Sequence, residues 1–598
     1  MCGIYGQVGF LAADADGAEA ATDTLIHRGP NARGSWHGDG VFLGMRRLSI
    51  IDLEGGGQPI WNEDESCCVI CNGEIYNFLD LRPQLEAKGH VFRTGSDSEV
   101  ILHAYEEWGV ECLRRFNGMF GFAIWDRREK RLFLARDRIG EKPLYYYTDG
   151  ARLIFASEIK AILASPAVPR KLRMHGLANF LAFGHSVAPE TMYEGILKLL
   201  PGHYLLAAGG TVKVCEYWDV GSEPQLTGGE ILDEDGYAAK VLELLDDSVR
   251  RRMVADVPLG AFLSGGVDST AIVALMKRHA TGPVKTFSLG FTIGGAFNEL
   301  SEARQVADHF GTEHHELRVE HADLVETLRK LVYHYDEPFG DAAAFPVYLL
   351  SRFASEHVRV ALSGDGGDEL FGGYRRYAAD RAARLFQRLP GAVSRGLLPA
   401  MANRLGRLRR IKRTLRTLPI TDPARGYPHY YHKLNGATEN DHLNRLLYVD
   451  VKTLLADGYM EKADKAMMAC GLEGRLPLLD HRLVELAFQI PGRYKIRGGS
   501  LKHILKRAVR GIVPAAVLRR RKHGFAVPLD PWFRGSLKKF AFEVLLDPAT
   551  RRRGYFRSSV VERLWREHAE GRETRDAQLW LLLNFELWHR IYLDGEAV

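Results

Sequence analysis

The sequence lacks a long apolar stretch, a secretory signal and a strong excess of charge of either sign. None of its apolar runs approaches the roughly 20 residues that span a bilayer. The start of the chain also lacks the basic, apolar and small-residue order of a signal peptide. These absences argue against membrane and secreted proteins, so we expect a reduced, cytoplasmic location.

Charge is nearly balanced, with 80 Lys and Arg against 75 Asp and Glu and a net charge of +5. So weak a bias predicts no nucleic-acid partner and no attraction to a membrane surface. The segment 381–416 is rich in arginine, but its leucines at helical spacing favour a buried stripe beneath a solvated basic face. The alternative for this segment, contact with RNA or DNA, would appear as salt-sensitive binding.

Cysteine is infrequent, and no histidines stand at metal-ligand spacing around it. Cys68 and Cys71 have the spacing of a redox or metal motif, but no second pair accompanies them. Both lie in an apolar, β-like run. We therefore expect strand packing at 67–71, with a metal site as the less favoured alternative.

The 598 residues suggest several domains, and the pattern changes near residue 215. Before it, short strands separated by glycine-rich turns predict layered antiparallel sheets. After it, strands alternate with helical segments, which predicts a parallel α/β sheet with further helices. A polar, glycine-rich stretch at 219–236 indicates a linker, so we expect domains at 2–215 and 238–598 joined by residues 216–237. The predicted strands are 3–10, 41–45, 67–71, 121–126 and 132–135, then 259–263, 285–290 and 358–362, with helices at 269–278 and 300–310.

Cys2 follows the initiator directly, in MCGIYG at 1–6. Methionine is trimmed when the next side chain is small, so we expect the mature protein to begin with Cys2. Its α-amine would then have a pKa of roughly 7.7–8.0, low enough to take the thiol proton near neutral pH. Nucleophile and base on one residue are typical of N-terminal nucleophile enzymes. A small residue at the start of a strand is the equally weighted alternative from this position alone.

The strongest internal motif is LSGGVDST at 263–270, which follows an apolar run and opens a helical one. A strand, a glycine turn and a helix N-terminus together form an anion site, because backbone N–H groups and the helix dipole face the phosphate oxygens. The lysine of the common phosphate loop is missing. Asp268 would instead hold a divalent cation against the phosphates.

A second loop repeats this chemistry in LSGDGGDE at 362–369, after another apolar strand. If the two strands are neighbours, Asp268 and Asp368 face one metal ion at the carboxyl edge of the sheet. An acidic turn without function is the alternative for either loop alone. Two such loops in one parallel domain favour nucleotide and metal binding.

MCGI at the N-terminus, LSGGVDS at 263–269 and LSGDGGDELFGGY at 362–374 resemble the glutamine-hydrolysing asparagine synthetases. The resemblance covers nearly the whole chain. It implies an αββα N-terminal-nucleophile sandwich with class II glutamine amidotransferase activity, followed by a synthetase domain of the ATP-pyrophosphatase type. Further landmarks are LIHRGP at 25–30, RLSIID at 47–52, NGEIYN at 72–77, TGSDSE at 94–99, LARDRIGEKPL at 134–144, FASEIK at 155–160, DEPF at 336–339, GRLPLLD at 474–480 and LKHIL at 501–505.

For the first domain the resemblance implies that Cys2 attacks the glutamine amide carbon and releases ammonia. Asn72 and the Gly73 backbone would form the oxyanion hole, where a preorganised donor lowers the barrier by about 2.7–4 kcal/mol. A forked guanidinium suits the substrate carboxylate, and anions suit its α-amine. The implied glutamine-binding residues are Arg47, Leu48, Ser49, Ile50, Ile51, Asn72, Gly73, Glu74 and Asp97.

For the second domain the resemblance implies that ATP activates the aspartate side chain as an acyl-adenylate, which ammonia converts into asparagine, AMP and pyrophosphate. Lys502 would stabilise charge near the α-phosphate, and Asp268 with Asp368 would bind Mg²⁺. The implied ATP-binding residues are Leu263, Ser264, Gly265, Gly266, Asp268, Ser269, Leu289, Ser363 and Gly364.

One position departs from the family pattern. Many members carry glutamate after LSG, where this chain has Asp365, which is one methylene shorter. The resemblance implies that the carboxylate at this position guides or deprotonates the incoming ammonia. The change of residue leaves two acceptors open: aspartate, or another carboxylate in cell-surface or natural-product biosynthesis. An N-terminal nucleophile hydrolase with a regulatory second half is a further alternative, which acceptor-stimulated AMP formation would exclude. A homodimer is expected from the resemblance alone.

Overall fold

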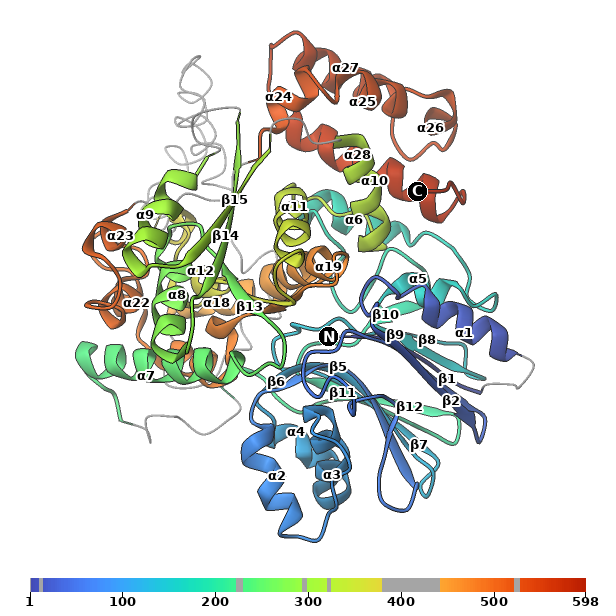
Figure 1. The fold of residues 1–598 in the computed structure, drawn as a ribbon. Coiled ribbons are helices and arrows are strands. Elements are labelled where there is room, and N and C mark those ends of the chain that lie inside the picture. Colours follow the sequence, from blue (N-terminus) through green and yellow to red (C-terminus); the bar gives the residue numbers. More distant parts are fainter. Residues whose placement is uncertain are drawn as a thin grey trace.

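The computed structural model describes residues 2–9, 14–221, 230–292, 298–319, 324–378, 441–520 and 527–598. Figure 1 shows a first half built on two sheets, coloured blue to cyan, beside a second half arranged around a third sheet. The arginine-rich segment 381–416 lies outside the described residues, as do residues 222–229 of the expected linker. Within the described ranges, no helix is long and apolar enough to cross a membrane.

The first half is a sandwich of two six-stranded antiparallel sheets. Helices α1 and α5 pack on the first sheet, and α3 packs on the second with α2 against it, which gives the αββα arrangement that the resemblance implies (Figure 1). In order, the first sheet contains β10 (Ile196–Lys198), β8 (Tyr145–Thr148), β9 (Leu153–Ala156), β1 (Cys2–Val8), β3 (Val41–Arg47) and β2 (Ala32–Gly38), and the second β12 (Thr211–Glu216), β11 (His203–Ala208), β7 (Arg131–Arg136), β6 (Gly118–Asp126), β5 (Cys67–Ile75) and β4 (Ile60–Trp61).

All five strands predicted for this half are confirmed. Strand β5 is buried along its whole length, and it carries Cys67, Cys68 and Cys71 as free, buried thiols. Strand packing at 67–71 is therefore confirmed. The helices of this half are α1 (Ala15–Asp23), α2 (Phe78–Glu86), α3 (Asp97–Trp108), α4 (Cys112–Arg115), α5 (Ile159–Leu163) and α6 (Met174–Phe183).

Part of the expected linker is packed against the second half. Trp218 is buried and its Nε1 donates a hydrogen bond to Glu485 Oε1 at 2.8 Å. Helix α7 (Glu234–Arg252) begins inside the expected linker, where Asp233 accepts from the Gly236 backbone N–H at 2.7 Å as its N-cap. The described ends of this segment are thus ordered by their own side chains.

The second half contains a five-stranded parallel sheet, as the alternation of strands and helices predicts. Helices α8 and α9 lie on one side of it, and α11 and α19 on the other (Figure 1). Strands β13 and β16 are hydrogen-bonded neighbours, so the two glycine-rich loops open at the same edge. In order, the strands are β15 (Glu313–Val319), β14 (Lys285–Phe291), β13 (Leu259–Phe262), β16 (Val360–Leu362) and β17 (Glu473–Arg475).

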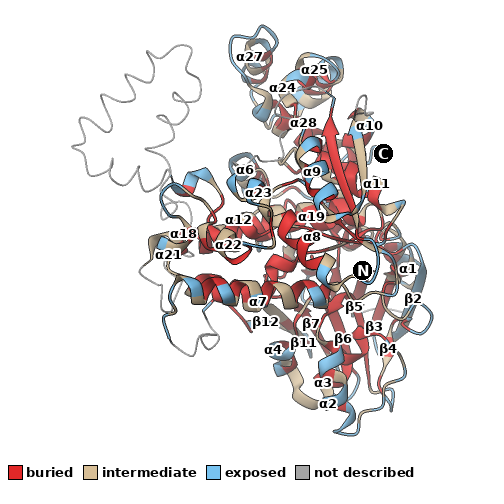
Figure 2. Ribbon diagram, turned by 60° about the vertical axis from the view of Figure 1, so that its left-hand side comes forward, coloured by how far each residue is buried: buried red, intermediate tan, exposed pale blue. Residues whose placement is uncertain are grey.

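Helices surround this sheet and fill most of the remaining described sequence. Figure 2 shows that the sheets and helices α8 and α19 are mostly buried, whereas α25 and α27 expose their outer faces. A π-helical segment, Val451–Met460, joins α18 to α19 without a break. The helices after α7 are α8 (Val267–His279), α9 (Leu300–Phe310), α10 (Leu324–Tyr335), α11 (Ala344–Ser355), α12 (Gly367–Phe371), α18 (His442–Asp450), α19 (Glu461–Met468), α20 (His481–Gln489), α21 (Gly492–Lys495), α22 (His503–Ala508), α23 (Ala515–Arg519), α24 (Leu529–Arg534), α25 (Lys538–Leu545), α26 (Pro548–Arg552), α27 (Ser558–Ala569) and α28 (Asp576–Tyr592).

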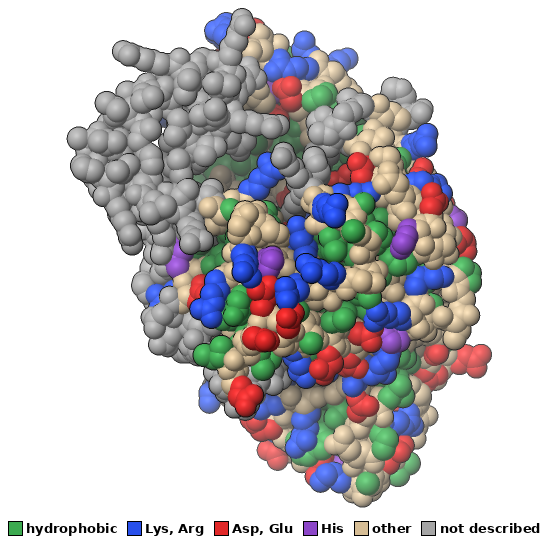
Figure 3. All heavy atoms as spheres, turned by 90° about the vertical axis from the view of Figure 1, so that its left-hand side faces the viewer, with side chains coloured by type: hydrophobic (Ala, Val, Ile, Leu, Met, Phe, Trp, Pro, Cys, Tyr) green, Lys and Arg blue, Asp and Glu red, His purple; other side chains and the backbone are tan. Residues whose placement is uncertain are grey.

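Basic and acidic side chains alternate on the face around α7 and α22, which Figure 3 shows. Glu234 lies 2.5 Å from Arg497 and 2.7 Å from His503, and Asp235 lies 2.5 Å from Arg507. Such pairing leaves little net field on this face, in line with the near-neutral composition.

Candidate active sites

Cys2 lies buried at the start of β1, between the two sheets of the sandwich. Its backbone N–H donates to Asn72 Oδ1 on β5 of the other sheet at 3.1 Å. Asn72 Nδ2 is buried and has no hydrogen-bond partner among the described residues, so it can donate to a ligand beside the thiol. Burial raises the pKa of the Cys2 thiol, while the neighbouring Arg47 acts in the opposite direction.

Arg47 stands directly opposite Cys2 in the β1–β3 register. Its guanidinium donates to three carbonyl oxygens of the following loop: Leu53 at 3.1 Å, Ile51 at 3.0 Å and Asp52 at 2.6 Å. These bonds fix the loop that begins with Leu48 beside the thiol. The Leu48 backbone lies beside the thiol, and the predicted residues Ser49 to Ile51 belong to the same loop.

Glu74 and Asp97 place two buried carboxylates beside this group. Asp97 opens α3, and its Oδ2 accepts from the Ile75 backbone N–H at 2.7 Å. Burial and the charge of Asp97 raise the pKa of Glu74 well above its usual range. Glu74 Oε1 lies 3.4 Å from an Arg475 NH2 group of the second half. The site can therefore receive an α-ammonium group, which would relieve the repulsion between the two carboxylates.

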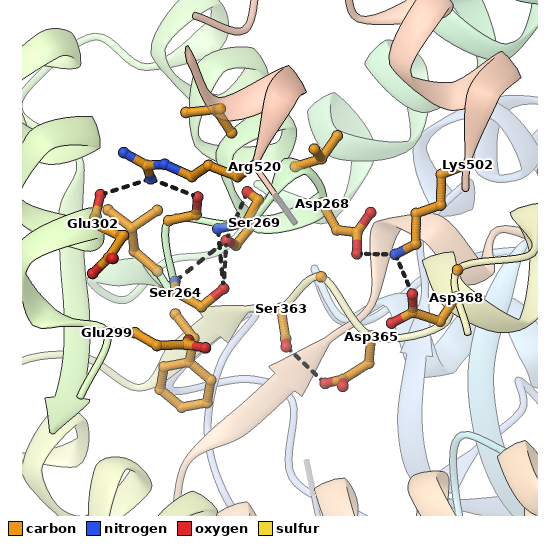
Figure 4. Close-up of a pocket in the computed structure, with 18 of the residues that line it drawn as sticks. Ser264, Asp268, Ser269, Glu299, Glu302, Ser363, Asp365, Asp368, Lys502 and Arg520 are labelled. Carbon is orange, nitrogen blue, oxygen red and sulfur yellow. Dashed lines mark hydrogen bonds and ion pairs between the residues drawn. The ribbon is translucent and has the colours of Figure 1, made fainter. Parts of the chain in front are cut away.

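A cavity of about 940 Å³ opens at the carboxyl edge of the parallel sheet. Its wall contains all the residues that the sequence predicts to bind ATP and the metal ion, together with Asp365 and Lys502. They come from the loops after β13 and β16, from β14, which carries Leu289, and from the start of α22; Figure 4 shows Ser264, Asp268, Ser269, Ser363, Asp365, Asp368 and Lys502 around one space. The predicted residues on its wall are Leu263, Ser264, Gly265, Gly266, Asp268, Ser269, Leu289, Ser363, Gly364, Asp365, Asp368 and Lys502.

The turn before α8 is shaped for an anion. The Ser264 backbone N–H donates to Ser269 Oγ at 3.3 Å, and the two hydroxyls lie 3.1 Å apart. Gly265 adopts φ +72°, and a Cβ there would meet the Glu302 backbone at 2.7 Å, so the turn requires glycine. The backbone N–H groups at the start of this 13-residue helix face the cavity wall, where the helix dipole favours negative charge.

Lys502 lies between the two predicted metal-binding carboxylates. Its ammonium forms an ion pair with Asp268 and lies 2.7 Å from Asp368 Oδ1 (Figure 4). Lys502 itself has φ +53°, and a Cβ on Gly373 would meet its Cε at 2.2 Å, so a glycine makes room for its side chain. Asp268 Oδ1 is buried without a hydrogen-bond partner among the described residues. Two oxygen donors thus face one place that is already favourable for a cation.

Asp365 lies apart from this trio. Its Oδ2 accepts from the Ser363 hydroxyl at 2.7 Å, which directs the shorter side chain along the cavity wall (Figure 4). Lys462, also on the wall, has a side chain that is 13% exposed; burial lowers its pKa, yet the nearby carboxylates of Asp341 and Asp365 raise it above the usual range. The sequence reasoning missed this lysine, which has no local motif.

Arg520 is a second residue that sequence reasoning missed. Its guanidinium donates to the Gly265 carbonyl at 2.9 Å and to the Glu302 carbonyl at 3.2 Å (Figure 4). It therefore holds the turn before α8 against α9. The adjacent arginines Arg519 and Arg520 on the cavity wall were the available signal, because clustered basic residues are typical of anion sites.

A buried ionic group between the halves was also missed. Arg28 NH1 lies 2.9 Å from Glu158 Oε1 and 2.8 Å from Asp464 Oδ2. Lys142 Nζ lies 3.1 Å from Asp464 Oδ1. Three of these residues belong to motifs of the first half and the fourth lies on α19, so the pairing joins the two halves. Charged residues inside otherwise apolar motifs were the only signal.

Comparisons with known proteins cover both halves. The family model for asparagine synthase matches residues 240–590, and the model for a glutamine amidotransferase domain matches residues 1–218. "Asparagine synthetase [glutamine-hydrolyzing] 1" of Bacillus subtilis is 34% identical, over 99% of this chain and 97% of its own length. "Putative asparagine synthetase [glutamine-hydrolyzing]" of Mycobacterium bovis is 35% identical, over 100% and 98%. "Asparagine synthetase B [glutamine-hydrolyzing]" of Escherichia coli is 28% identical, over 92% and 86%.

Proposed function

The chain belongs to the family of glutamine-hydrolysing asparagine synthetases, and we propose that its two sites divide glutamine-dependent asparagine synthesis between them. The observation that carries this proposal is the union of twelve predicted residues on one cavity wall, in the same chain as a buried Cys2 beside Asn72. The named relatives favour aspartate as acceptor over another carboxylate.

The first site releases ammonia from glutamine. After removal of Met1, the Cys2 nitrogen becomes the α-amine, and Asn72 Oδ1 at 3.1 Å holds it in place. The amine takes the thiol proton, and the thiolate attacks the amide carbon. Asn72 Nδ2 and the Gly73 N–H stabilise the resulting oxyanion. Ammonia leaves with the proton from the amine, and water then hydrolyses the thioester to glutamate.

Substrate binding at this site follows from charge. Arg47 pairs with the glutamine carboxylate, for which its loop carbonyls orient the guanidinium. Glu74 and Asp97 receive the α-ammonium group, whose positive charge offsets their mutual repulsion. Residues 48–51 form the adjoining wall.

The second site activates aspartate with ATP, its second substrate. The turn from Ser264 to Ser269 and the start of α8 bind the departing pyrophosphate. Lys502 supplies positive charge at the α-phosphate. The aspartate side-chain carboxylate attacks the α-phosphorus, so the bond to pyrophosphate breaks and an acyl-adenylate forms. Ammonia then attacks the acyl carbon, and AMP leaves.

The donor set fits Mg²⁺. Asp268 and Asp368 offer carboxylate oxygens, the ligands that this hard cation prefers, and Asp268 Oδ1 has no hydrogen-bond partner within the described ranges. Bound Mg²⁺ would neutralise phosphate charge. Asp365, whose carboxylate accepts from the Ser363 hydroxyl, would take a proton from the attacking ammonia.

The test separates the two sites. We expect Cys2→Ala to abolish asparagine formation from glutamine, ATP, Mg²⁺ and aspartate, while added ammonium salts still support it. Cys215→Ala, which removes a half-exposed thiol on β12, is the matched control and should retain both activities. Loss of both activities in Cys2→Ala would contradict separate sites, and amide formation from a different carboxylate but not from aspartate would contradict the acceptor.

The assembly and its location complete the proposal. A homodimer is supported by the resemblance, and light scattering would show about twice the 67.1 kDa of one chain. We propose a cytoplasmic location as well. A mass of one chain across micromolar concentrations would contradict the dimer.

A further inference from the structure

A cluster of two histidines and two glutamates lies on the first half, away from both active sites. Glu63 comes from the turn between β4 and β5, His90 from the loop after α2, and His103 and Glu106 from α3. Helices α2 and α3 lie at the lower edge of the first half in Figure 1. One ligand atom from each side chain can be chosen so that all lie within 4.8 Å of one another. Three chain segments therefore converge on one point with metal-binding side chains.

The spacings are close to those of a tetrahedron around a small cation. His103 Nδ1 lies 3.1 Å from Glu106 Oε2 and 3.7 Å from Glu63 Oε2. His90 Nδ1 lies 3.7 Å from Glu63 Oε1 and 3.8 Å from Glu106 Oε2. Zinc bonds of about 2.0–2.1 Å to nitrogen and oxygen imply ligand separations of about 3.3–3.4 Å. The four separations given differ from these values by up to about half an ångström, and the remaining pairs of ligand atoms lie within 4.8 Å, so the side chains would have to move closer together around the ion.

Both histidines are oriented as metal ligands are. Each turns Nδ1 toward the centre and Nε2 toward an outer carboxylate: His103 Nε2 lies 3.5 Å from Glu99 Oε1, and His90 Nε2 lies 3.8 Å from Glu107 Oε2. These separations are longer than hydrogen bonds, so each outer carboxylate favours the proton on Nε2 only through its charge, which leaves the Nδ1 lone pair for a cation.

The glutamates are also held from outside the cluster. Glu106 Oε1 accepts from Asn62 Nδ2 at 2.6 Å, which leaves Oε2 facing the centre. Glu63 Oε1 accepts from the Val91 backbone N–H at 2.7 Å. His103 is fully buried, whereas the Glu63 side chain is 34% exposed, so an ion has a path from solvent.

We propose that Glu63, His90, His103 and Glu106 form a structural binding site for a divalent transition-metal ion, with zinc as the best match. Imidazole and carboxylate ligands suit zinc, and four protein ligands leave no open position for catalysis. The ion would tie the β4–β5 turn and the loop after α2 to α3. Because α3 begins with Asp97, the same ion would stiffen the support of the glutaminase carboxylate.

The test uses the full-length chain, stripped with chelator and kept in excess Mg²⁺ to occupy the ATP site. Zinc content after dialysis is measured by elemental analysis, and cobalt substitution reports tetrahedral geometry through its intense visible absorption bands. We expect one zinc per chain in this site, a higher thermal unfolding midpoint with zinc, and at least tenfold weaker binding in His90→Gln and in Glu63→Gln.

His175→Gln is the matched control, because His175 forms a surface pair with Glu190 at 2.8 Å outside the cluster. It should bind zinc like the unmodified chain. Glu63→Gln keeps the side-chain shape at a partly exposed position, so it decides the matter if His90→Gln does not fold. Equal zinc affinity in Glu63→Gln and the unmodified chain, or no tetrahedral cobalt spectrum in the unmodified chain, would overturn the proposal.

Discussion

Asp464 is the carboxylate on which the docking of the two halves depends most directly. It is 1% exposed, and it accepts from Arg28 and Lys142, both of which belong to the first half. Asp464→Asn keeps the shape but removes the charge. Its amide oxygen can still accept from one cation, while its amide NH2 faces the other, donor against donor.

The loss of stability in Asp464→Asn depends on which carboxylates Arg28 and Lys142 still contact. Arg28 keeps Glu158 at 2.9 Å, so its charge stays paired. Lys142 is 3% exposed and has no other carboxylate within 4.0 Å among the described residues. Removing one partner of a buried pair costs about 3–5 kcal/mol, because it leaves an uncompensated charge away from water. We expect the free energy of unfolding to decrease by this amount, because the contact between the two halves is weakened.

The experiment measures urea unfolding and, separately, glutamine-dependent and ammonia-dependent synthesis. Asp464→Asn should lower the midpoint of the first transition and reduce glutamine-dependent synthesis more than ammonia-dependent synthesis. The double variant Lys142→Met with Asp464→Met removes both charges and should recover most of the stability, since apolar replacements of a whole pair are often neutral. An unchanged midpoint in Asp464→Asn, or a double variant as unstable as the single one, would refute the reasoning.

Asn72→Ala should slow glutamine hydrolysis by about 10²–10³-fold through loss of one oxyanion donor, with ammonia-dependent synthesis unchanged; similar losses in both assays would contradict this role. Lys502→Gln should remove synthesis from either nitrogen source while glutaminase activity persists, which a half-reaction assay checks. Burial lowers the pKa of Lys495 from 10.5 to about 7, so the folded state disfavours its charged form and stability rises with pH between these values. Lys495→Met should therefore be more stable by up to roughly 5 kcal/mol at pH 6, with the gain closing toward pH 10.5; a gain independent of pH would count against the burial argument.

The strands and loops that carry the chemistry were predictable because their signals are local. Strand β13 is an apolar run that ends at a glycine turn, and the helix after it begins within the same ten residues. The metal-site prediction is conditional on β16 lying beside β13, and the parallel pairing of the two strands meets that condition. The union of Asp268 and Asp368 across 100 residues followed from that single topological step.

The contacts between the halves could not be predicted in the same way. Arg28 and Asp464 are 436 residues apart, and no periodicity links them. Trp218 looked like the edge of a linker, yet its indole is buried against Glu485. The proposed metal ligands could not be predicted for the same reason, because they come from three segments and only His103 and Glu106 share a helical spacing. Pairing of charged side chains over long separations is decided by the assembled surfaces and not by any segment alone.

Arg475 shows how closely the two active sites are joined. Its backbone carbonyl accepts from the Ser363 N–H at 3.0 Å, at the end of the strand that carries Asp365. Its guanidinium reaches the other way, to Glu74 Oε1 at 3.4 Å in the glutamine cradle. Arg475 is fully buried, so water does not screen this interaction, and its charge opposes the rise in the pKa of Glu74. An isolated first half would retain Glu74 without this counter-ion. The proposed glutamine site therefore takes a counter-ion from β17 of the second half, which couples the electrostatics of the two halves.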